Sequence, residues 1–485
     1  MIVKRGSGSI LFTTLGILAL GVVWVFLWLF SGHSIIPSPW ETVLQTFSML
    51  SDAYTWEQLF VTLMRVGAGF LLAFVAGATV GILAGKVKAL EHFFRPATLF
   101  LQGIPPLLWV IPLILLFGIG HLSPILVIAL ICFPLAAVNI AEGMKTVPGE
   151  LEEMVEIFAP GAFPKLREVV IPHLHPFFSA TLDLGFALGL KASVVGEFFG
   201  ANNGIGFQIQ AAYQSLQTRR LFAWGLVLVG LIILSSRLFS RIEGIAKALR
   251  KPPAGARATR RPAGNADQLY KVSRRTSPVK LRGIAFAYPG SKPLFEGIDL
   301  TIEPDEVAVI SGESGVGKST FLKIIAGILE PSRGDVERPG RVGFVFQDDR
   351  LIPWQTLQGN IALPLNYLGY ARRDSGAIAK GLLAEFGLDG EGEKYPDALS
   401  GGMRKRAAFA MCLARIPSLV LLDEPFAGLH KEARSALWKR FLHILDQHPV
   451  PVIVVTHYPE ELVPRSRLSF YTLRGKPAAL LGKTA

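Results

Sequence analysis

The sequence predicts a multi-domain protein, in which an all-α bundle of six membrane-spanning helices precedes a soluble α/β domain. Hydrophobic residues make up 51% of the 485 residues, and the mean hydropathy of +0.42 is high for a soluble protein. Six long apolar stretches lie in the first half of the chain, and a strand–glycine loop–helix pattern begins at Val307. We therefore expect a membrane domain at 1–243, a linker at 244–277 and a soluble domain at 278–485.

Each apolar stretch is about 20 residues long, the length that crosses a bilayer as a helix. The stretches are residues 10–30, 59–84, 97–117, 124–142, 177–199 and 222–242. The first stretch could be a signal peptide, but its apolar core is long and no small-residue cleavage site follows it. We interpret it as a membrane span that begins in the cytoplasm, because Lys4 and Arg5 precede it.

The charges of the loops predict the topology. The loop at 31–58 contains no lysine or arginine, whereas the loops at 85–96 and 143–176 contain three each. Loops that carry lysine and arginine tend to stay in the cytoplasm, so these last two loops, the N-terminus and the soluble domain are expected inside. Arg219 and Arg220 break this pattern, because they lie in a loop expected outside.

The formal net charge of +12 is explained by the membrane and the linker rather than by nucleic acid, for which the chain has no motif. Residues 244–282 contain eleven lysines or arginines and one acidic residue. This segment either lies on anionic lipid headgroups or is a soluble tether. Cys132 and Cys412 are far apart in apolar surroundings, and they indicate two buried thiols rather than a disulfide or a metal site.

The loop after the strand pattern at Val307 has the composition of a phosphate-binding loop. Its glycines allow successive N–H groups to point at one phosphate, and the following helix adds its positive end. The lysine of such a loop reaches the β- and γ-phosphates of a nucleotide such as ATP, and the next hydroxyl can ligate Mg²⁺. The nucleotide-binding residues are Gly312, Glu313, Ser314, Gly315, Val316, Gly317, Lys318, Ser319 and Thr320.

Two further buried-strand patterns end on polar side chains. Leu419–Leu422 leads to Asp423 and Glu424, and Val452–Thr456 leads to His457. Ligands of open parallel sheets bind at the carboxyl ends of the strands. We expect Asp423 to hold Mg²⁺, Glu424 to act as the general base toward water, and His457 to contact the γ-phosphate.

The turn Ser400–Gly401–Gly402 opens a helical run that begins with Arg404, Lys405 and Arg406, and it is a second potential anion-binding helix end. A single nucleotide needs only one such end in one domain. Two copies arranged head to tail could instead hold ATP between the phosphate loop of one and the Ser-Gly-Gly turn of the other.

These motifs make residues 278–465 resemble the ATPase domain of ABC transporters. Gly312–Thr320 matches the Walker A motif, Leu399–Met403 the signature motif, and Leu419–Glu424 the Walker B motif. The resemblance implies an adenine-stacking aromatic, a Q-loop glutamine that also serves Mg²⁺, and a switch histidine. The matching residues are Tyr288, Gln347 and His457. The sequence departs from the family at His430, where an aspartate that connects the two ATP sites usually stands.

The first half resembles the permeases of importers. Residues 142–176 look like their cytoplasmic EAA loop, with Glu153 at the glutamate position, which implies a coupling helix that docks near Gln347. The permease and the stretch from Phe346 to Trp354 are most similar to nitrate, sulfonate and taurine importers, a group whose relatives carry bicarbonate or thiamine-pyrimidine precursors. Because permease and ATPase are fused here, the resemblance implies that one chain is a half-transporter completed by a second copy.

Ionisable residues in the fifth span are candidates for a solute pathway or for structural pairs. Asp183, Lys191 and Glu197 lie in or near it. Charges inside a membrane are costly and mark either function or pairing. Asp183 and Lys191 are about 12 Å apart along a helix and cannot pair within it.

Together these features predict ATP-driven import of a small solute, expected to be an anion, across a bacterial inner membrane with a periplasmic binding protein. Three alternatives remain: an exporter half-transporter, a machine that transmits force without transport, and a soluble ATPase with a membrane anchor. The EAA-like loop argues against the exporter, the short outside loops argue against the force transmitter, and the six spans argue against the anchor.

Overall fold

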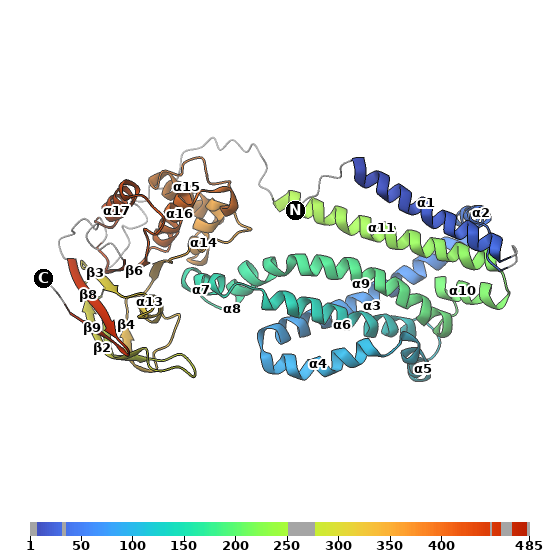
Figure 1. The fold of residues 1–485 in the computed structure, drawn as a ribbon, viewed down its shortest axis with the longest axis horizontal. Coiled ribbons are helices and arrows are strands. Elements are labelled where there is room, and N and C mark those ends of the chain that lie inside the picture. The colour runs from blue at the N-terminus through green and yellow to red at the C-terminus, as the bar shows by residue number, and fades with distance from the viewer. Residues whose placement is uncertain (1–6, 32–34, 251–276, 447–448, 457–467, 483–485) are drawn as a thin grey trace. The chain divides into compact units, whose positions relative to one another are not determined.

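The structure is a computed structural model that describes residues 7–31, 35–250, 277–446, 449–456 and 468–482. The chain divides into two compact units. One comprises Met1–Val147 and His173–Pro253, and the other comprises Pro148–Pro172 and Ala254–Ala485. The segment 148–172 therefore lies between membrane helices in the sequence but packs with the soluble unit. Figure 1 shows each unit with most of its elements labelled.

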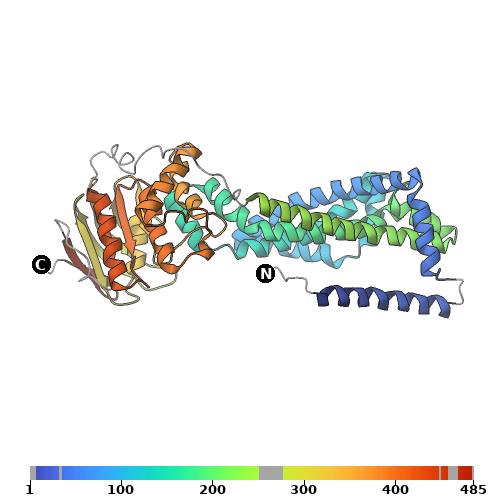
Figure 2. The ribbon, with the colours of Figure 1, turned by 90° about the horizontal axis from the view of Figure 1, so that it is seen from above.

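The first unit is helical throughout its described part. Its helices are α1 (Ser7–Phe30), α2 (Pro39–Leu50), α3 (Ala53–Lys86), α4 (Lys88–Gly103), α5 (Pro106–Phe117), α6 (Leu122–Lys145), α9 (Ile171–Gly200), α10 (Ile205–Gln214) and α11 (Thr218–Arg250). The long helices α3, α6, α9 and α11 run lengthwise beside one another in two perpendicular views (Figures 1 and 2). An all-α bundle is thus confirmed.

Among the described residues, four helices are long and apolar enough to cross a membrane, and α4 with α5 makes a fifth if the bent pair is one span. The predicted third span, 97–117, is wrong as a continuous helix, because α4 and α5 meet at 97°. The bend follows Gly103, where Pro105 and Pro106 prevent the helix from continuing. Helix α1 is apolar but shorter in its described part, at Thr14–Phe30.

Helices α3 and α6 pack closely because α3 presents a stripe of small residues to α6. The stripe repeats every four residues, at Gly69, Ala73, Gly77, Gly81 and Gly85. A Cβ added at Gly77 would lie 2.6 Å from the Cβ of a residue on α6, closer than real atoms approach. In a bilayer, where apolar surfaces do not drive helices together, such close backbone contact stabilises the pair.

The second unit contains a sheet of nine described strands in the order β4-β1-β2-β9-β8-β3-β7-β6-β5. The strands are β1 (Val279–Phe286), β2 (Phe295–Ile302), β3 (Val307–Gly312), β4 (Arg333–Glu337), β5 (Val342–Val345), β6 (Leu419–Asp423), β7 (Val452–Val455), β8 (Leu468–Gly475) and β9 (Ala478–Leu481). Strands β3, β7, β6 and β5 are parallel, so their carboxyl ends share one edge. At one end of the sheet, the neighbouring strands β4, β1 and β2 pair antiparallel.

Helices cover the parallel strands, whose residues are almost entirely buried, as expected for a sheet enclosed on both faces. The helices of this unit are α7 (Gly149–Phe158), α8 (Ala162–Pro164), the π-helix η1 (Lys165–Val170), α13 (Lys318–Ala326), α14 (Leu357–Tyr367), α15 (Arg372–Glu385), the 3-10 helix η2 (Pro396–Ala398), α16 (Gly401–Ala414) and α17 (Lys431–Asp446). Figure 2 shows α17 against the sheet. Its Phe441 packs edge-on against Phe409 of α16 and stacks with Trp438 in an aromatic core.

Candidate nucleotide site and its connections

The phosphate loop connects β3 to α13, and its backbone requires glycine. Gly312, Gly315 and Gly317 have φ angles of +153°, +79° and +102°. Side chains at two of these positions would also collide with neighbours. A Cβ would lie 2.6 Å from the Leu473 carbonyl oxygen at Gly312 and 2.8 Å from the Phe295 ring at Gly317. The loop therefore has the tight curvature that aims backbone N–H groups at a bound phosphate.

Lys318 is the first residue of α13 and its ammonium lies over the loop. The Nζ atom donates to the carbonyl oxygens of Gly312, at 2.9 Å, and Glu313, at 3.0 Å. This places the charge at the opening of the helix, where the helix dipole also favours an anion. Tyr288 is half-exposed beside the loop, its hydroxyl 3.1 Å from Thr320 Oγ1 and its ring edge-on to Phe286.

Asp423, at the end of β6, is brought beside Ser319 of α13. It is only 4% exposed, and its Oδ1 atom has no hydrogen-bond partner within the described part of the chain. Burial raises the pKa of Asp423 above its ordinary value of 3.8; a hydrogen bond with Ser319 opposes this, and the charge of Glu424 adds to it. A buried, partly unsatisfied carboxylate next to a hydroxyl matches the oxygen ligands that Mg²⁺ prefers.

Glu424 follows β6 directly and adopts a left-handed backbone, with φ at +43°. Its N–H donates to the Val455 carbonyl of the neighbouring strand at 2.9 Å. A non-glycine residue in this conformation costs free energy, and such strain concentrates at functional sites. The turn places Glu424 at the same sheet edge as Asp423.

The signature residues form the start of α16. Ser400 is its N-cap, and the hydroxyl accepts from the Met403 N–H at 3.3 Å, while Gly401 is exposed and Gly402 half-buried. Gln347 follows β5 and is exposed, as is His430 before α17. His457 lies outside the described residues, so its predicted role stays a prediction.

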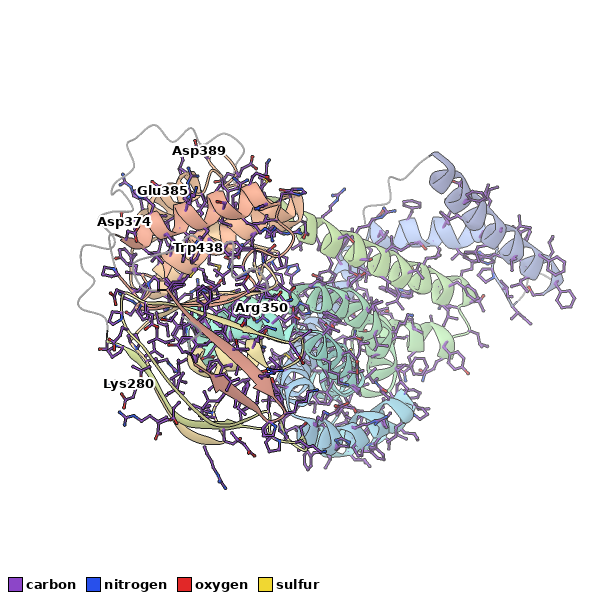
Figure 3. The ribbon with its side chains drawn as sticks, turned by 60° about the vertical axis from the view of Figure 1, so that its left-hand side comes forward. Lys280, Arg350, Asp374, Glu385, Asp389 and Trp438 are labelled. Carbon is purple, nitrogen blue, oxygen red and sulfur yellow. The ribbon has the colours of Figure 1, made fainter. Side chains whose placement is uncertain are left out.

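The segment 148–172 is anchored to the ATPase elements by Glu153 of α7. Its carboxylate pairs with Lys323 of the helix that follows the phosphate loop, at 2.9 Å, and with Arg350 of the loop after β5, at 2.6 Å. Figure 3 shows Arg350 beside α7. The Arg350 guanidinium also stacks over Phe346, 4.0 Å from the ring centre. One glutamate thus touches two elements that carry nucleotide-site residues.

Glu168 of η1 makes a second anchor for the same segment. Its carboxylate accepts hydrogen bonds from Gln355 at 2.8 Å and from the Tyr367 hydroxyl at 2.9 Å, and its carbonyl accepts from Trp354 at 3.0 Å. Burial and the neighbouring carboxylate raise the pKa of Tyr367 to about 12, so the tyrosine stays a donor at any physiological pH. None of the residues that bind Glu153 and Glu168 was predicted from the sequence as their partner.

In the first unit, Glu197 is buried in an ion pair rather than exposed along a path. Arg65 Nη1 donates to Glu197 Oε1 at 3.0 Å, and both side chains are at most 1% exposed. The second carboxylate oxygen accepts from Thr62 and from the Gly206 N–H, both at 2.9 Å. This geometry favours the structural interpretation of Glu197. Arg65 was not predicted as the partner of Glu197, although an arginine inside an apolar stretch indicates either a buried pair or a functional residue.

Two family models match the chain. The model "ABC transporter" matches residues 295–427, and the model "Binding-protein-dependent transport system inner membrane component" matches residues 77–244. The second match covers the helices of the first unit that flank the segment 148–172, together with that segment. The two matches do not overlap, so one chain carries both components.

Curated relatives and a solved structure match the soluble unit. The formylaminopyrimidine import ATP-binding protein of Halalkalibacterium halodurans is 36% identical over 39% of this chain and 77% of its own length. The taurine import ATP-binding protein of Pseudomonas putida is 38% identical over 38% of this chain and 74% of its own length. A dimeric ATP-binding cassette bound to ADP and phosphate is 27% identical over 40% of this chain and 93% of its own, with a TM-score of 0.37. The chain belongs to the ABC transporter family, and it joins a helical permease domain to a domain that hydrolyses ATP.

Proposed function

We propose that two copies of this chain form an importer that uses ATP to carry a small solute across a bacterial inner membrane. Each copy supplies a permease bundle and an ATPase domain, so a pair contains the two permeases and two ATPases of a complete transporter. The separation of Ser400–Gly402 from the phosphate loop in the sequence supports this stoichiometry, because the two motifs offer two anion-binding helix ends per chain.

The proposed site uses the chain's own residues in distinct roles. The loop Gly312–Thr320 and Lys318 bind the phosphates, and Tyr288 stacks on adenine. Glu424 accepts a proton from the attacking water, while Gln347 and His457 orient the water and the γ-phosphate. The signature turn Ser400–Gly402 of the partner copy closes over the same nucleotide.

Mg²⁺ fits the pair Ser319 and Asp423, because the buried Oδ1 of Asp423 lacks a partner among the described residues. When bound, the ion would neutralise charge that develops on the phosphates. Gln347 belongs to the predicted ligands as well. The polar atoms of Ser319 and Asp423 are held together by their own hydrogen bond, which keeps the site preformed.

One observation carries the transport proposal. The chain leaves the membrane unit at Val147, packs residues 148–172 with the ATPase domain, and returns to the membrane unit at His173. A segment tied to both Lys323 and Arg350, yet continuous with two membrane helices, can transmit movement of the ATPase to the bundle. An ATPase with a mere membrane anchor needs no such segment.

The solute class and the orientation are inferred from relatives and charge. Relatives of the ATPase domain are import proteins for taurine and formylaminopyrimidine. A small solute of this range, expected to be an organic or inorganic anion, and a periplasmic solute-binding protein therefore complete the proposal. The lysines and arginines of the loops at 85–96 and 143–176 support a cytoplasmic N-terminus and ATPase domain.

The catalytic assignment is tested with Glu424→Gln in the purified full chain. We expect hydrolysis of MgATP to fall below detection while binding of a fluorescent ATP analogue stays within about 2-fold, because the amide keeps the shape but cannot accept the proton. With MgATP this variant should have the mass of two chains of 52.7 kDa each. Full hydrolysis would refute the role of Glu424, and a monomer would refute the shared site.

The solute is tested by measuring ATP hydrolysis of the chain in lipid nanodiscs with candidate binding proteins. Each binding protein is added with and without taurine, an aliphatic sulfonate or formylaminopyrimidine. Stimulation by one loaded binding protein supports import of that solute. Equal activity with every combination would refute the proposed solute range.

A further inference from the structure

The helix that follows the signature turn contains a buried cation that the proposed ATP chemistry does not use. Lys405 lies one turn into α16 and is 4% exposed. Lysine is almost never buried unless it is paired. Its Nζ atom donates to the Gln347 carbonyl at 2.8 Å and lies 3.0 Å from Asp349 Oδ1. Both partners belong to the loop after β5.

The neighbouring arginines do not share this environment. Arg404 is 41% exposed and its Nε atom is 3.8 Å from Asp349 Oδ2, at the outer limit of an ion pair. Arg406 instead donates to the carbonyls of Phe386 and Gly387, at 3.2 and 3.0 Å. The three basic residues therefore make three separate contacts, and of the three only Lys405 lies within 3.0 Å of its partners in the loop 347–350.

The loop 347–350 is held from both sides. On one side Lys405 of α16 binds Gln347 and Asp349. On the other side Arg350 binds Glu153 of α7. The contacts form a continuous path from the segment 148–172, through the loop, to the helix whose first residues are the signature turn.

We propose that Lys405 is a positioning residue that makes the signature turn move together with the loop 347–350 and helix α7. This rests on the proposed function, in which Ser400–Gly402 closes over the partner's nucleotide. Through the ion pair Lys405–Asp349, a movement of α7 then shifts the signature turn at the second ATP site. The same movement of the loop also shifts Gln347 at the chain's own ATP site. Lys405 itself touches no nucleotide.

Lys405 is desolvated, with its side chain 5% exposed, and Asp349 is 17% exposed, so separating the pair is costly. A buried cation that loses its partner leaves an uncompensated charge, so the loop and α16 cannot separate without cost. Replacing Lys405 by methionine removes this restraint and keeps the length and apolar stem of the side chain. The loop then shifts relative to α16 while each nucleotide-binding motif keeps its own fold.

The test measures MgATP hydrolysis by the full chain in lipid nanodiscs. We expect Lys405→Met to lower kcat about 10-fold, a size within the range of coupling residues, with KM within about 2-fold. The exposed neighbour gives the matched control, and Arg404→Gln should keep kcat within about 2-fold. Lys405→Arg, which keeps a cation and a donor beside Gln347 and Asp349, should keep most of the activity.

A double-mutant cycle separates transmission from a merely local role. If Lys405 and Glu153 act on one path, Lys405→Met with Glu153→Gln should lower kcat no further than the stronger single variant. Binding of a fluorescent ATP analogue to each variant shows that the phosphate loop is still folded. Fold losses that multiply, an unchanged kcat in Lys405→Met, or a KM that rises as much as kcat falls would each overturn the inference. A wild-type chain without MgATP hydrolysis would instead overturn the proposed function.

Discussion

Replacing Glu153 by glutamine should loosen helix α7 from the ATPase domain. The carboxylate is 28% exposed and pairs with Lys323 at 2.9 Å and Arg350 at 2.6 Å. The amide keeps the size of the side chain but loses both charge-assisted hydrogen bonds. Burial raises the pKa of Glu153, but the hydrogen bonds from Lys323 and Arg350 lower it more, so the net shift is below its ordinary value of 4.5.

The magnitude follows from the two contacts. Hydrogen bonds to charged groups contribute about 1.5–3 kcal/mol when buried, and partial exposure of this glutamate reduces the two together to about 1–2 kcal/mol. Local opening of α7 should therefore become about 10-fold more frequent, since about 1.4 kcal/mol corresponds to a factor of ten. The cost concerns this segment and not the global unfolding of the chain.

Hydrogen–deuterium exchange with mass spectrometry measures this opening directly. Peptides that cover Gly149–Phe158 should exchange about 10-fold faster in Glu153→Gln than in the wild type, and peptides from α17 should not change. Glu152→Gln is the matched control, because no described residue forms an ion pair with Glu152. Equal exchange in the two variants would refute the idea that Glu153 anchors α7.

The sign of the pH dependence is fixed by the same contacts. A carboxylate whose pKa is lowered in the folded state stabilises that state above its unfolded pKa, and it loses this contribution as the pH falls through the folded value. The difference between wild type and Glu153→Gln should thus be complete at neutral pH. It should shrink only below the ordinary value of 4.5.

Three further predictions concern stability and reactivity. Glu197→Ala should leave the buried Arg65 without its carboxylate partner and lower the free energy of unfolding by about 3–5 kcal/mol, measured as a lower Tm in detergent. Glu57 is exposed, so Glu57→Ala should not lower the Tm, and equal Tm values for the two variants would contradict the buried pair. Burial raises the pKa of the Cys412 thiol, so a maleimide should label it only after unfolding, as mass spectrometry can show; rapid labelling of the native chain would contradict its burial. Gly77→Leu should push α3 from α6 and cost about 1–3 kcal/mol; an unchanged Tm would show that the helices are not in close contact.

Much of the fold was predictable because its signals are local. Apolar runs of bilayer length identified the membrane helices, and β-branched runs that end in Gly312 and Asp423 identified two central strands. The phosphate loop was predictable for the same reason, since glycine is needed wherever φ is positive. The bend between α4 and α5 was missed, although Pro105 and Pro106 mark it, because hydropathy averages over a window longer than the break.

The connections of the site were not predictable, because they join residues distant in the sequence. Lys323 and Arg350 look like ordinary surface cations until folding brings Glu153 between them. Lys405 was visible only as one of three consecutive basic residues, and its burial depends on how α16 lies against the loop after β5. Periodicity tells which face of an element is buried, but pairing is decided by tertiary packing.

The two glutamates that anchor the segment 148–172 differ in a way that bears on how the segment can move. Glu153 binds two cations at 2.9 and 2.6 Å, whereas Glu168 binds the neutral donors Gln355 and Tyr367 at short range and the cation Arg167 only at 3.7 Å. Salt screens the partly exposed contacts of Glu153, but it does not weaken hydrogen bonds from neutral groups to the same degree. High salt should therefore speed exchange in α7 more than in η1. The segment would then open at its α7 end first and pivot about Glu168, and equal salt effects at both ends would show that it moves as one piece.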